Sequence, residues 1–386
     1  MKRIILTGGG TGGHIYPLLA VAEEIKKISE DSVELIYFGP NHPLNDEFEE
    51  LDIKIYSLAS SKLRRYVALE NFLDVPKFFI SVIQAFWRLY FLMPDIVFSK
   101  GGPGAFAVIL AAKFYMIPVV IHESDSIPGL TNRLSAAFAK RIAIAFNKAS
   151  EYFPPEKTAF VGNPIRSKLF KDWSDQKSAK LSLDFKPEEP VIFVLGGSQG
   201  SEKINNFILD NLEIFLQDFQ IYHQTGSNNF GNVEELAKAF FKTAPERLQN
   251  RYRFKSYFSL EELKIAYNAA DIVISRAGSG AIYEIAAFEK PAILIPLASA
   301  ANDHQKINAY IYAKAGAAEV IEESNLKPNL LVVQIKEIIK NTEKKQSMSE
   351  AAKNFAKPEA AKMIGEEILK LIRFKPPFEF KKNKEQ

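Results

Sequence analysis

The chain has 386 residues, of which 47% are hydrophobic and 25% are charged, so its composition is that of a globular protein long enough for two domains. The 49 basic residues are nearly balanced by 46 acidic ones, and the net charge of +3 is too even for a protein that binds nucleic acid over a whole face. The absence of cysteine excludes disulfides, zinc–thiolate sites and cysteine nucleophiles, and it favours the cytosol.

The first part of the chain alternates short β-branched segments with segments of helical length. Strands are expected at residues 3–7, 33–38, 95–99, 118–122 and 141–146. The first strand leads directly into a glycine loop, without the longer apolar region and cleavage site of a signal peptide, so export is not expected. The alternation predicts a doubly wound parallel sheet.

The same alternation restarts after a polar segment at residues 171–189, which indicates a domain boundary nearby. Further strands are expected at residues 191–195, 220–223, 252–256, 271–275, 292–295 and 318–321. We therefore predict an α/β protein with two Rossmann-like, doubly wound parallel-sheet domains, residues 1–162 and 163–348. A helix at residues 349–372, broken at Pro358, is expected to cross back to the first domain ahead of a charged tail at residues 373–386.

A glycine loop follows the first strand. The segment from Thr7 to His14 reads TGGGTGGH and precedes a helix, a position where backbone N–H groups and the helix dipole bind phosphate. It contains the G-x-G-x-x-G pattern of dinucleotide-binding oxidoreductases, but the second strand ends in Phe38-Gly39-Pro40, without the acid that would bind ribose. The loop favours a different phosphate-containing ligand, and the alternative is a tight turn in which glycine only permits unusual dihedral angles.

Further motifs occur in order along the chain. The first loop extends to GGGTGGHIYPLLAVAEEI, and it is followed by SKGGPG (99–104), GLTNR (129–133), GNPIR (162–166), GGSQGS (196–201) with Asn205 beyond, and SRAGSGAIYE (275–284) followed by Pro291, Pro296, Asp303, His304, Gln305 and Asn308. Together these motifs resemble the bacterial undecaprenyldiphospho-muramoylpentapeptide N-acetylglucosaminyltransferase (MurG) family, in glycosyltransferase family 28.

The resemblance implies a GT-B fold, in which the two domains face a central cleft. It also implies inverting transfer of N-acetylglucosamine from UDP-N-acetylglucosamine to the muramoyl 4-hydroxyl of lipid I, which forms lipid II in peptidoglycan biosynthesis. The first domain would hold the acceptor and the second the UDP-sugar.

Residues for UDP-N-acetylglucosamine follow from the loops and the resemblance. Arg166 is a candidate phosphate ligand, Glu284 would bind the ribose hydroxyls, Phe258 would recognise uracil through its backbone, and Gln305 would bind sugar hydroxyls. A surface ion pair, a helix-capping carboxylate and a loop polar group are the structural alternatives for Arg166, Glu284 and Gln305. The full predicted set is Thr11, Gly12, Gly13, Asp125, Arg166, Ser198, Gln199, Phe258, Ser279, Gly280, Ala281, Ile282, Tyr283, Glu284 and Gln305.

Inversion needs a base that removes the proton of the acceptor hydroxyl. His14 is our candidate, because a helix N-terminus disfavours the imidazolium and keeps the ring neutral; its alternative role is to cap the loop. Glu123 is the second candidate and would more readily orient the acceptor. Asp125 stands where the family commonly has an amide, so its charge would either repel diphosphate or accept a sugar hydroxyl. No Asp-x-Asp pair is present, so neither a metal nor a cofactor is expected.

Membrane contact is expected from Lys62, Arg64 and Arg65 together with the aromatic segment at residues 78–93, which includes Phe86 and Trp87. Basic groups beside aromatic side chains suit an anionic membrane surface, although a core helix is the alternative. The segment is too short and too polar to span a bilayer. We expect a peripheral protein at the cytoplasmic face of the plasma membrane, where other cell-wall synthesis proteins are possible partners.

Two other functions fit the same residues. A UDP-N-acetylglucosamine epimerase would share the donor but would need no lipid surface. A non-catalytic membrane-associated scaffold would keep the fold without turnover, and Asp125 is the feature that favours it.

Overall fold

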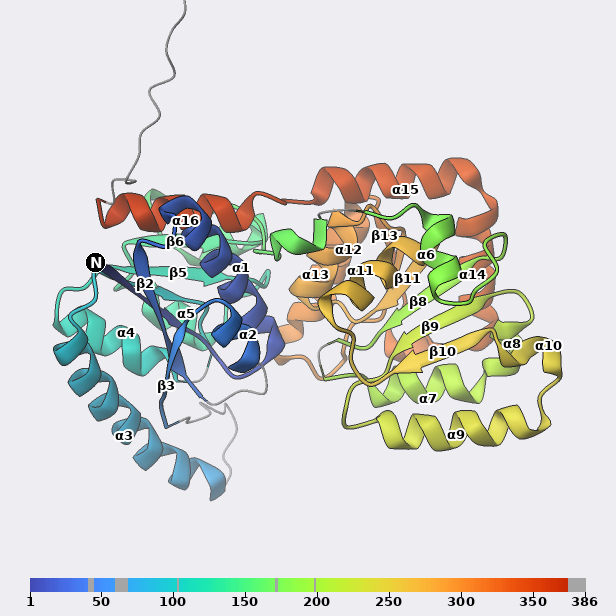
Figure 1. Ribbon diagram of the computed structural model, residues 1–386, viewed down its shortest axis with the longest axis horizontal. Helices are drawn as coiled ribbons and strands as arrows, with labels where there is room; N and C mark the ends of the chain where they lie inside the picture. The colour runs from blue at the N-terminus through green and yellow to red at the C-terminus, as the bar shows by residue number, and fades with distance from the viewer. Residues whose placement is uncertain (41–44, 60–68, 103, 171–172, 198, 374–386) are drawn as a thin grey trace, which may run out of the picture. The chain divides into compact units, whose positions relative to one another are not determined.

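The computed structural model of the protein describes residues 1–40, 45–59, 69–102, 104–170, 173–197 and 199–373 (Figure 1). The chain forms two compact units. Unit 1 comprises Met1–Arg166 together with the segment that begins at Pro358, and unit 2 comprises Ser167–Lys357. Each unit is described by itself below.

Unit 1 is built on a parallel sheet of seven strands in the order β3-β2-β1-β4-β5-β6-β7. The central strands are rich in Ile, Val and Leu and are buried on both faces, as expected when helices cover both sides of a parallel sheet. The strands are β1 (Lys2–Thr7), β2 (Val33–Gly39), β3 (Lys54–Ser57), β4 (Ile96–Ser99), β5 (Val119–Glu123), β6 (Arg141–Ile144) and β7 (Thr158–Phe160).

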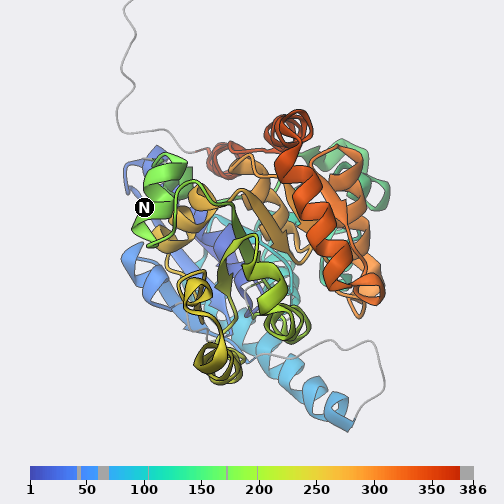
Figure 2. The same cartoon turned by 90° about the vertical axis from the view of Figure 1, so that its right-hand side faces the viewer.

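The helices of unit 1 include one from the far end of the sequence. Helix α16 packs against α1, where Gly365 allows close approach to Ile25, and its Ile364 and Ile368 join the unit 1 core. The described helical segments are α1 (Gly12–Ser29), α2 (Asn45–Glu50), α3 (Leu69–Leu92), α4 (Ala105–Phe114), α5 (Leu130–Ser135), η1 (Asn147–Tyr152), η2 (Pro155–Lys157) and α16 (Ala360–Leu371). Helix α3 lies on the outside of the unit in both views (Figures 1 and 2).

Unit 2 repeats the arrangement with a six-stranded parallel sheet, β10-β9-β8-β11-β12-β13. Its strands are β8 (Val191–Leu195), β9 (Gln220–Gln224), β10 (Tyr252–Lys255), β11 (Ile272–Ser275), β12 (Ala292–Leu294) and β13 (Ala318–Val320). Its helical segments are η3 (Ser167–Phe170), α6 (Gln176–Ser182), α7 (Glu202–Asp210), α8 (Leu212–Leu216), α9 (Phe230–Thr243), α10 (Glu246–Gln249), α11 (Leu260–Ala269), α12 (Ser279–Ala287), η4 (Ala301–Asp303), α13 (His304–Lys314), η5 (Glu323–Asn325), α14 (Pro328–Lys340) and α15 (Thr342–Phe355).

The terminal helical segment expected at residues 349–372, with a break at Pro358, is two helices that lie in different units. Helix α15 begins earlier, because the side chain of Asn341 caps it by accepting the N–H of Lys344. It ends at Phe355, just ahead of Pro358, which lacks the N–H that a continuing helix needs. Helix α15 packs in unit 2 and α16 in unit 1, so the chain passes between the units at Lys357.

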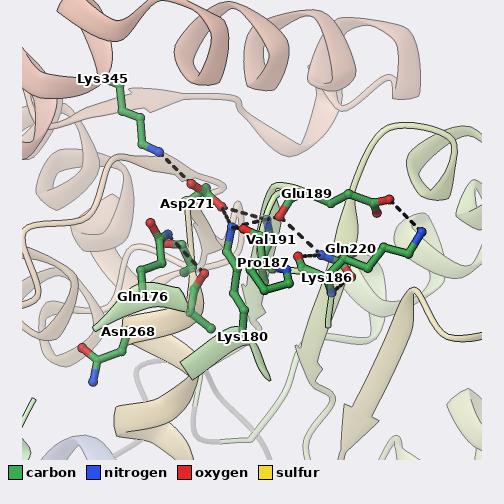
Figure 3. Close-up of polar contacts among 12 residues, drawn as sticks. Gln176, Lys180, Lys186, Pro187, Glu189, Val191, Gln220, Asn268, Asp271 and Lys345 are labelled. Atoms are coloured by element: carbon green, nitrogen blue, oxygen red, sulfur yellow. Dashed lines mark hydrogen bonds and ion pairs between the residues drawn. The ribbon is translucent and has the colours of Figure 1, made fainter. Parts of the chain in front are cut away.

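A buried ionic cluster holds the amino-terminal edge of the unit 2 sheet (Figure 3). The carboxylate of Asp271, just ahead of β11, accepts hydrogen bonds from the ammonium groups of Lys180 and Lys345, each at 2.7 Å, and from the N–H of Val191 at 3.0 Å. Lys180 also donates to the carbonyl of Glu189 at 2.9 Å. The cluster ties α6 and α15 to the sheet, at the edge opposite to the glycine loops.

Each sheet has one point where the strand order reverses. In unit 1 this point lies between β1 and β4, and in unit 2 it lies between β8 and β11. Ligands of doubly wound proteins bind at the carboxyl ends of the strands at such points. The glycine loops that follow β1 and β8 lie at these two positions.

Candidate functional site

Three loops meet at the carboxyl edge of the unit 1 sheet, after β1, β4 and β5. Gly102, in the loop after β4, has φ +88° and packs against the backbone of Gly9 and the ring of His14. A Cβ atom at Gly102 would lie 2.8 Å from the Cα of Gly9 and 3.0 Å from Nε2 of His14. Glycine is therefore required at this position both by the backbone conformation and by the space beside the imidazole.

His14 lies in the first turn of α1, as the sequence predicts. The hydroxyl of Thr11 is 2.8 Å from its Nδ1, and Thr11 makes no side-chain cap to the helix backbone. Burial, together with the nearby ammonium of Lys100, lowers the pKa of His14 to about 4, although Asp125 acts in the opposite direction. The ring is therefore neutral at pH 7. Gly12 is buried and Gly13 is exposed in the same turn.

Glu123 is buried at the end of β5, and both of its oxygens are occupied. Oε1 accepts the N–H of Asp125 at 2.9 Å, while Oε2 accepts the N–H of Gly129 at 3.1 Å and the side-chain amide of Asn132 at 2.9 Å. Burial and the neighbouring Asp125 raise the pKa of Glu123. These contacts show that Glu123 holds the loop that carries Asp125, which is itself half-buried.

Arg166 is the last residue of the first segment of unit 1. Its guanidinium forms an ion pair of 2.8 Å with Glu47 and lies over the ring of Tyr16, 4.3 Å from the centroid. An ion pair, the alternative considered above, is thus present, although it is partly buried. A phosphate at Arg166 would have to compete with the carboxylate of Glu47.

The glycine loop of unit 2 lies between β8 and α7. Gly200 has φ +77°, and a Cβ there would lie 2.1 Å from the carbonyl oxygen of Thr225, so the loop packs directly on the end of β9. Ser201 caps α7 by accepting the N–H of Ile204. Gln199 is exposed, while Ser198 lies outside the described residues.

Helix α12 begins at the carboxyl end of β11 with the predicted residues Ser279, Gly280 and Ala281. Its N-cap is Gly278, which offers no side-chain cap to the first turn. Uncapped N–H groups and the helix dipole make this turn suited to an anion. Ile282 and Tyr283 have buried side chains, and the Tyr283 ring packs against Phe355.

Glu284 lies in the second turn of α12, half-buried, and accepts the hydroxyl of Tyr267 at 3.2 Å. Phe258 is buried and stacks on Tyr222, and its N–H donates to the side chain of Gln224 at 3.2 Å. Gln305, at the start of α13, accepts the N–H of Leu297 at 3.1 Å. The structure thus brings the predicted donor residues in its described part of unit 2 to the carboxyl edge of one sheet, and leaves Thr11, Gly12, Gly13, Asp125 and Arg166 in unit 1.

Sequence reasoning gave no role to Arg276, Asn132 or Lys100, although each falls within a quoted motif. The buried guanidinium of Arg276 donates to Ser201 Oγ at 2.7 Å and to the carbonyl of Ile295 at 3.1 Å, and it pairs with Glu323 at 2.6 Å. It therefore joins the loops after β8, β11 and β12. The sequence contained one signal for Arg276, namely a charged residue that directly follows an apolar strand.

The predicted membrane residues have different surroundings. Lys62, Arg64 and Arg65 lie outside the described residues. Phe86 is half-buried and packs against Phe114 and Tyr115, with ring centroids 5.1 and 5.8 Å away. Trp87 is 61% exposed and stacks on Phe91.

Within the described ranges, no helix is long and apolar enough to cross a membrane. In the same part of the chain, no group of three or more His, Asp or Glu side chains is placed to hold a metal ion.

Family models match both halves of the chain. The glycosyltransferase family 28 N-terminal domain matches residues 4–144, and the glycosyltransferase family 28 C-terminal domain matches residues 191–364. These ranges contain the glycine loops at both switch points.

Individual relatives agree with these matches. The chain is 36% identical to the "UDP-N-acetylglucosamine--N-acetylmuramyl-(pentapeptide) pyrophosphoryl-undecaprenol N-acetylglucosamine transferase 2" of Bacillus anthracis, over 89% of this chain and 93% of the relative. Among solved structures it is similar to MurG of Acinetobacter baumannii, with a TM-score of 0.70 and 26% identity over 96% of this chain and 100% of the other.

A UDP-GlcNAc 2-epimerase from Neisseria meningitidis, solved bound to UDP-GlcNAc, is also similar, with a TM-score of 0.67 and 16% identity over 95% of this chain and 100% of the other. That likeness shows a shared fold alone. With two parallel Rossmann-like sheets and both family domains, the chain has the GT-B fold and belongs to the N-acetylglucosamine transferases of glycosyltransferase family 28.

Proposed function

We propose that this protein transfers N-acetylglucosamine, with inversion, from UDP-N-acetylglucosamine to the muramoyl 4-hydroxyl of lipid I and so forms lipid II. The observation that carries this proposal is the pair of glycine-loop clusters, one at the switch point of each sheet, in a chain that is 36% identical to a transferase of that name. Unit 2 is proposed to bind the donor, and unit 1 the acceptor.

The first turn of α12 and the loop after β8 supply the groups that a departing UDP requires. Backbone N–H groups at a helix N-terminus stabilise the negative charge that develops on a diphosphate. Arg276 supports them, because it fixes Ser201 and thereby the start of α7. Glu284 is proposed to bind the ribose hydroxyls from the second turn of α12.

The first turn of α1 supplies the base. If the Nδ1 proton of His14 is donated to the hydroxyl of Thr11, Nε2 carries the lone pair that accepts the proton of the acceptor hydroxyl. Glycine at position 102 keeps a side chain away from Nε2, since a Cβ atom there would lie 3.0 Å from it. Glu123 is proposed as a positioning residue, since its oxygens hold the backbone of the loop after β5.

Binding to an anionic membrane surface is proposed for an exposed apolar patch on unit 1, which we call the aromatic face. Its members, each at least 48% exposed, are Phe79, Ile80, Ile83, Trp87, Tyr90 and Phe91 of α3 with Phe114 and Met116. Exposed Lys77 lies on α3, and exposed Lys113 lies on α4, which also carries Phe114. Aromatic side chains flanked by ammonium groups favour shallow insertion among anionic lipids, which supports a peripheral location at the cytoplasmic face.

A UDP-release assay tests the proposed activity directly. Full-length protein is incubated with UDP-N-acetylglucosamine, with and without a short-chain lipid I analogue. We expect UDP release and disaccharide formation that depend on the acceptor. Epimerisation of the donor alone would support an epimerase, and the absence of both products with folded protein would support a non-catalytic role.

A further inference from the structure

Lys100 is a buried cation in the unit 1 loop cluster. It directly follows β4 and is 2% exposed, and its backbone N–H donates to the carbonyl of Thr7 at 2.9 Å across the switch point. Within the part of the chain that the structure describes, its Nζ atom has no hydrogen-bond partner. A buried ammonium normally has its donors paired, because desolvation without hydrogen bonds is costly.

The carboxylates near Lys100 do not fill this role. Glu123 is close enough to raise the pKa of Lys100, but its two oxygens already accept N–H groups of Asp125, Gly129 and Asn132. Asp125 also favours the charged form of Lys100 without accepting a hydrogen bond from Nζ. Among the described residues, the ammonium therefore has opposite charge nearby but no oxygen that accepts a hydrogen bond from it.

Glycines surround the lysine on its own loop and on the loop after β1. A Cβ atom at Gly8 would lie 3.5 Å from the Cβ of Lys100 and 3.6 Å from that of His14, so this glycine lies beside both residues. Gly101 and Gly102 follow Lys100 with positive φ. Loops without side chains let a ligand's phosphoryl oxygens approach the backbone and the base together.

Burial lowers the pKa of Lys100 to about 8, against the opposing effect of Glu123 and Asp125. The side chain is thus mostly protonated at pH 7 and becomes neutral as the pH rises through about 8. Keeping an unpaired charge in this position destabilises the folded unit unless an anion binds there. Such a local conflict with stability is typical of functional residues.

We infer that the ammonium of Lys100 is a substrate-binding residue, which holds an anionic phosphoryl oxygen of the acceptor at the carboxyl edge of β1, β4 and β5. The inference rests on the proposed function. The acceptor named for the relative from Bacillus anthracis contains a pyrophosphoryl group, and we propose that this chain uses the same acceptor. With the phosphoryl group held at Lys100, the acceptor would be anchored beside His14, the proposed base.

The substitution Lys100→Met keeps the length of the side chain and removes its charge. We expect the KM for a short-chain lipid I analogue to rise roughly 10- to 100-fold, as for loss of a hydrogen bond to a charged group, with the KM for UDP-N-acetylglucosamine unchanged within about twofold. We also expect the variant's melting temperature to rise, since a buried unpaired charge is removed. The exposed Lys140→Met is the matched control and should change neither KM.

The pH profile gives a second measurement. In the wild type, kcat/KM for the acceptor should fall as the pH rises through about 8, because Lys100 loses its proton. Lys100→Met should lack this decrease. A rise in the donor KM would instead place the donor phosphate at Lys100. Unchanged KM values, with lower stability, would make Lys100 a counterion of the carboxylates. Either result would overturn the inference.

Binding of inorganic pyrophosphate separates this inference from the proposed activity. It is titrated calorimetrically into wild type and Lys100→Met in the presence of saturating UDP. Weaker binding to the variant is expected whether or not the protein transfers sugar, while equal binding to both proteins would contradict the inference. Lys100→Gln serves as the second uncharged variant if Lys100→Met does not fold.

Discussion

His14 can accept a proton at neutral pH because its surroundings oppose the imidazolium. Burial and the Lys100 ammonium lower its pKa to about 4, and Thr11 holds Nδ1. We expect His14→Ala to lower kcat by roughly 10² to 10⁴-fold with little change in donor KM. Steady-state kinetics with the lipid I analogue measure both. A kcat within a few-fold of the wild type would remove His14 as the base.

The lowered pKa of His14 also predicts how kcat of the wild type depends on pH in acid. Since the pKa of His14 lies near 4 in the folded protein, protonation should begin to reduce kcat only as the pH falls toward that value, and not near the ordinary histidine value of 6.5. Rates are to be measured over the pH range in which circular dichroism shows the fold to be intact. A loss of activity centred near pH 6.5 would show that the ring is solvated during turnover.

The sequence predicted the loop residues better than their contacts. His14 and Glu123 both lie in the unit 1 cluster, because β1, β4 and β5 are consecutive parallel strands whose carboxyl ends lie at the same edge of the sheet. The ion pair of Arg166 with Glu47 depends on a segment distant in sequence, and the occupied oxygens of Glu123 depend on how the loop that follows β5 folds back. The position of Lys100, a charged residue directly after an apolar strand, is a signal that the sequence contains. Only the three-dimensional structure shows that its Nζ atom has no hydrogen-bond partner among the described residues.

At the scale of elements, α3 presents the aromatic face. We expect Trp87→Ser with Phe91→Ser to weaken binding to anionic liposomes by tenfold or more, because each large apolar side chain contributes roughly 1.5–3 kcal/mol when fully buried. Sedimentation with vesicles of phosphatidylglycerol measures the change. The double variant Leu236→Ser with Leu330→Ser, at exposed apolar positions of unit 2, is the control. Equal binding of all three proteins would exclude the aromatic face as the contact.

The Asp271 cluster is predicted to stabilise unit 2 without serving its ligand. Asp271→Asn leaves the buried Lys180 and the half-buried Lys345 without their carboxylate, so the free energy of unfolding should fall by roughly 3–5 kcal/mol at pH 7. Urea unfolding measures this, with the exposed Asp210→Asn as control. The KM for the donor should stay within a few-fold, because the cluster lies at the opposite sheet edge. A large donor KM effect at unchanged stability would contradict this assignment.

The pH dependence of that variant has a definite sign. Burial alone would raise the pKa of Asp271, but Lys345 and Lys180 lower it overall. A carboxylate with a lowered folded pKa stabilises the protein above its unfolded value, and the contribution is lost as the pH falls through the folded value. The stability difference between wild type and Asp271→Asn should therefore shrink in acid. A constant difference from pH 7 to pH 3 would show that the charge on Asp271 is not responsible.

Element types were largely predictable, because strands buried on both faces are continuous apolar runs. The edge strands β3 and β7 were missed: β3 mixes polar and apolar residues without a buried run, and β7 is only three residues long. The break of the carboxyl-terminal helical ending at Pro358 was predicted, but its start at Thr342 was missed. Its first helix is set by the Asn341 cap, and the second packs on α1 through Gly365.

At the scale of the whole molecule, the two units share one plan: a parallel sheet, a switch point and a glycine loop at the carboxyl edge. The alternation of strands and helical segments, which restarts after the polar segment at residues 171–189, predicted this duplication. We therefore assign one ligand to each switch point, the UDP-sugar to unit 2 and the lipid-linked acceptor to unit 1. Sequence patterns alone could not show which of the two ligands the loop after β1 binds, because both ligands contain a diphosphate.

Hydrogen–deuterium exchange of the full-length protein with and without UDP-N-acetylglucosamine tests this assignment most directly. We predict that the donor protects backbone amides in the loop after β8, in the first turn of α12 and at the start of α13. Protection restricted to the loops after β1, β4 and β5, or no protection at saturating donor, would contradict it.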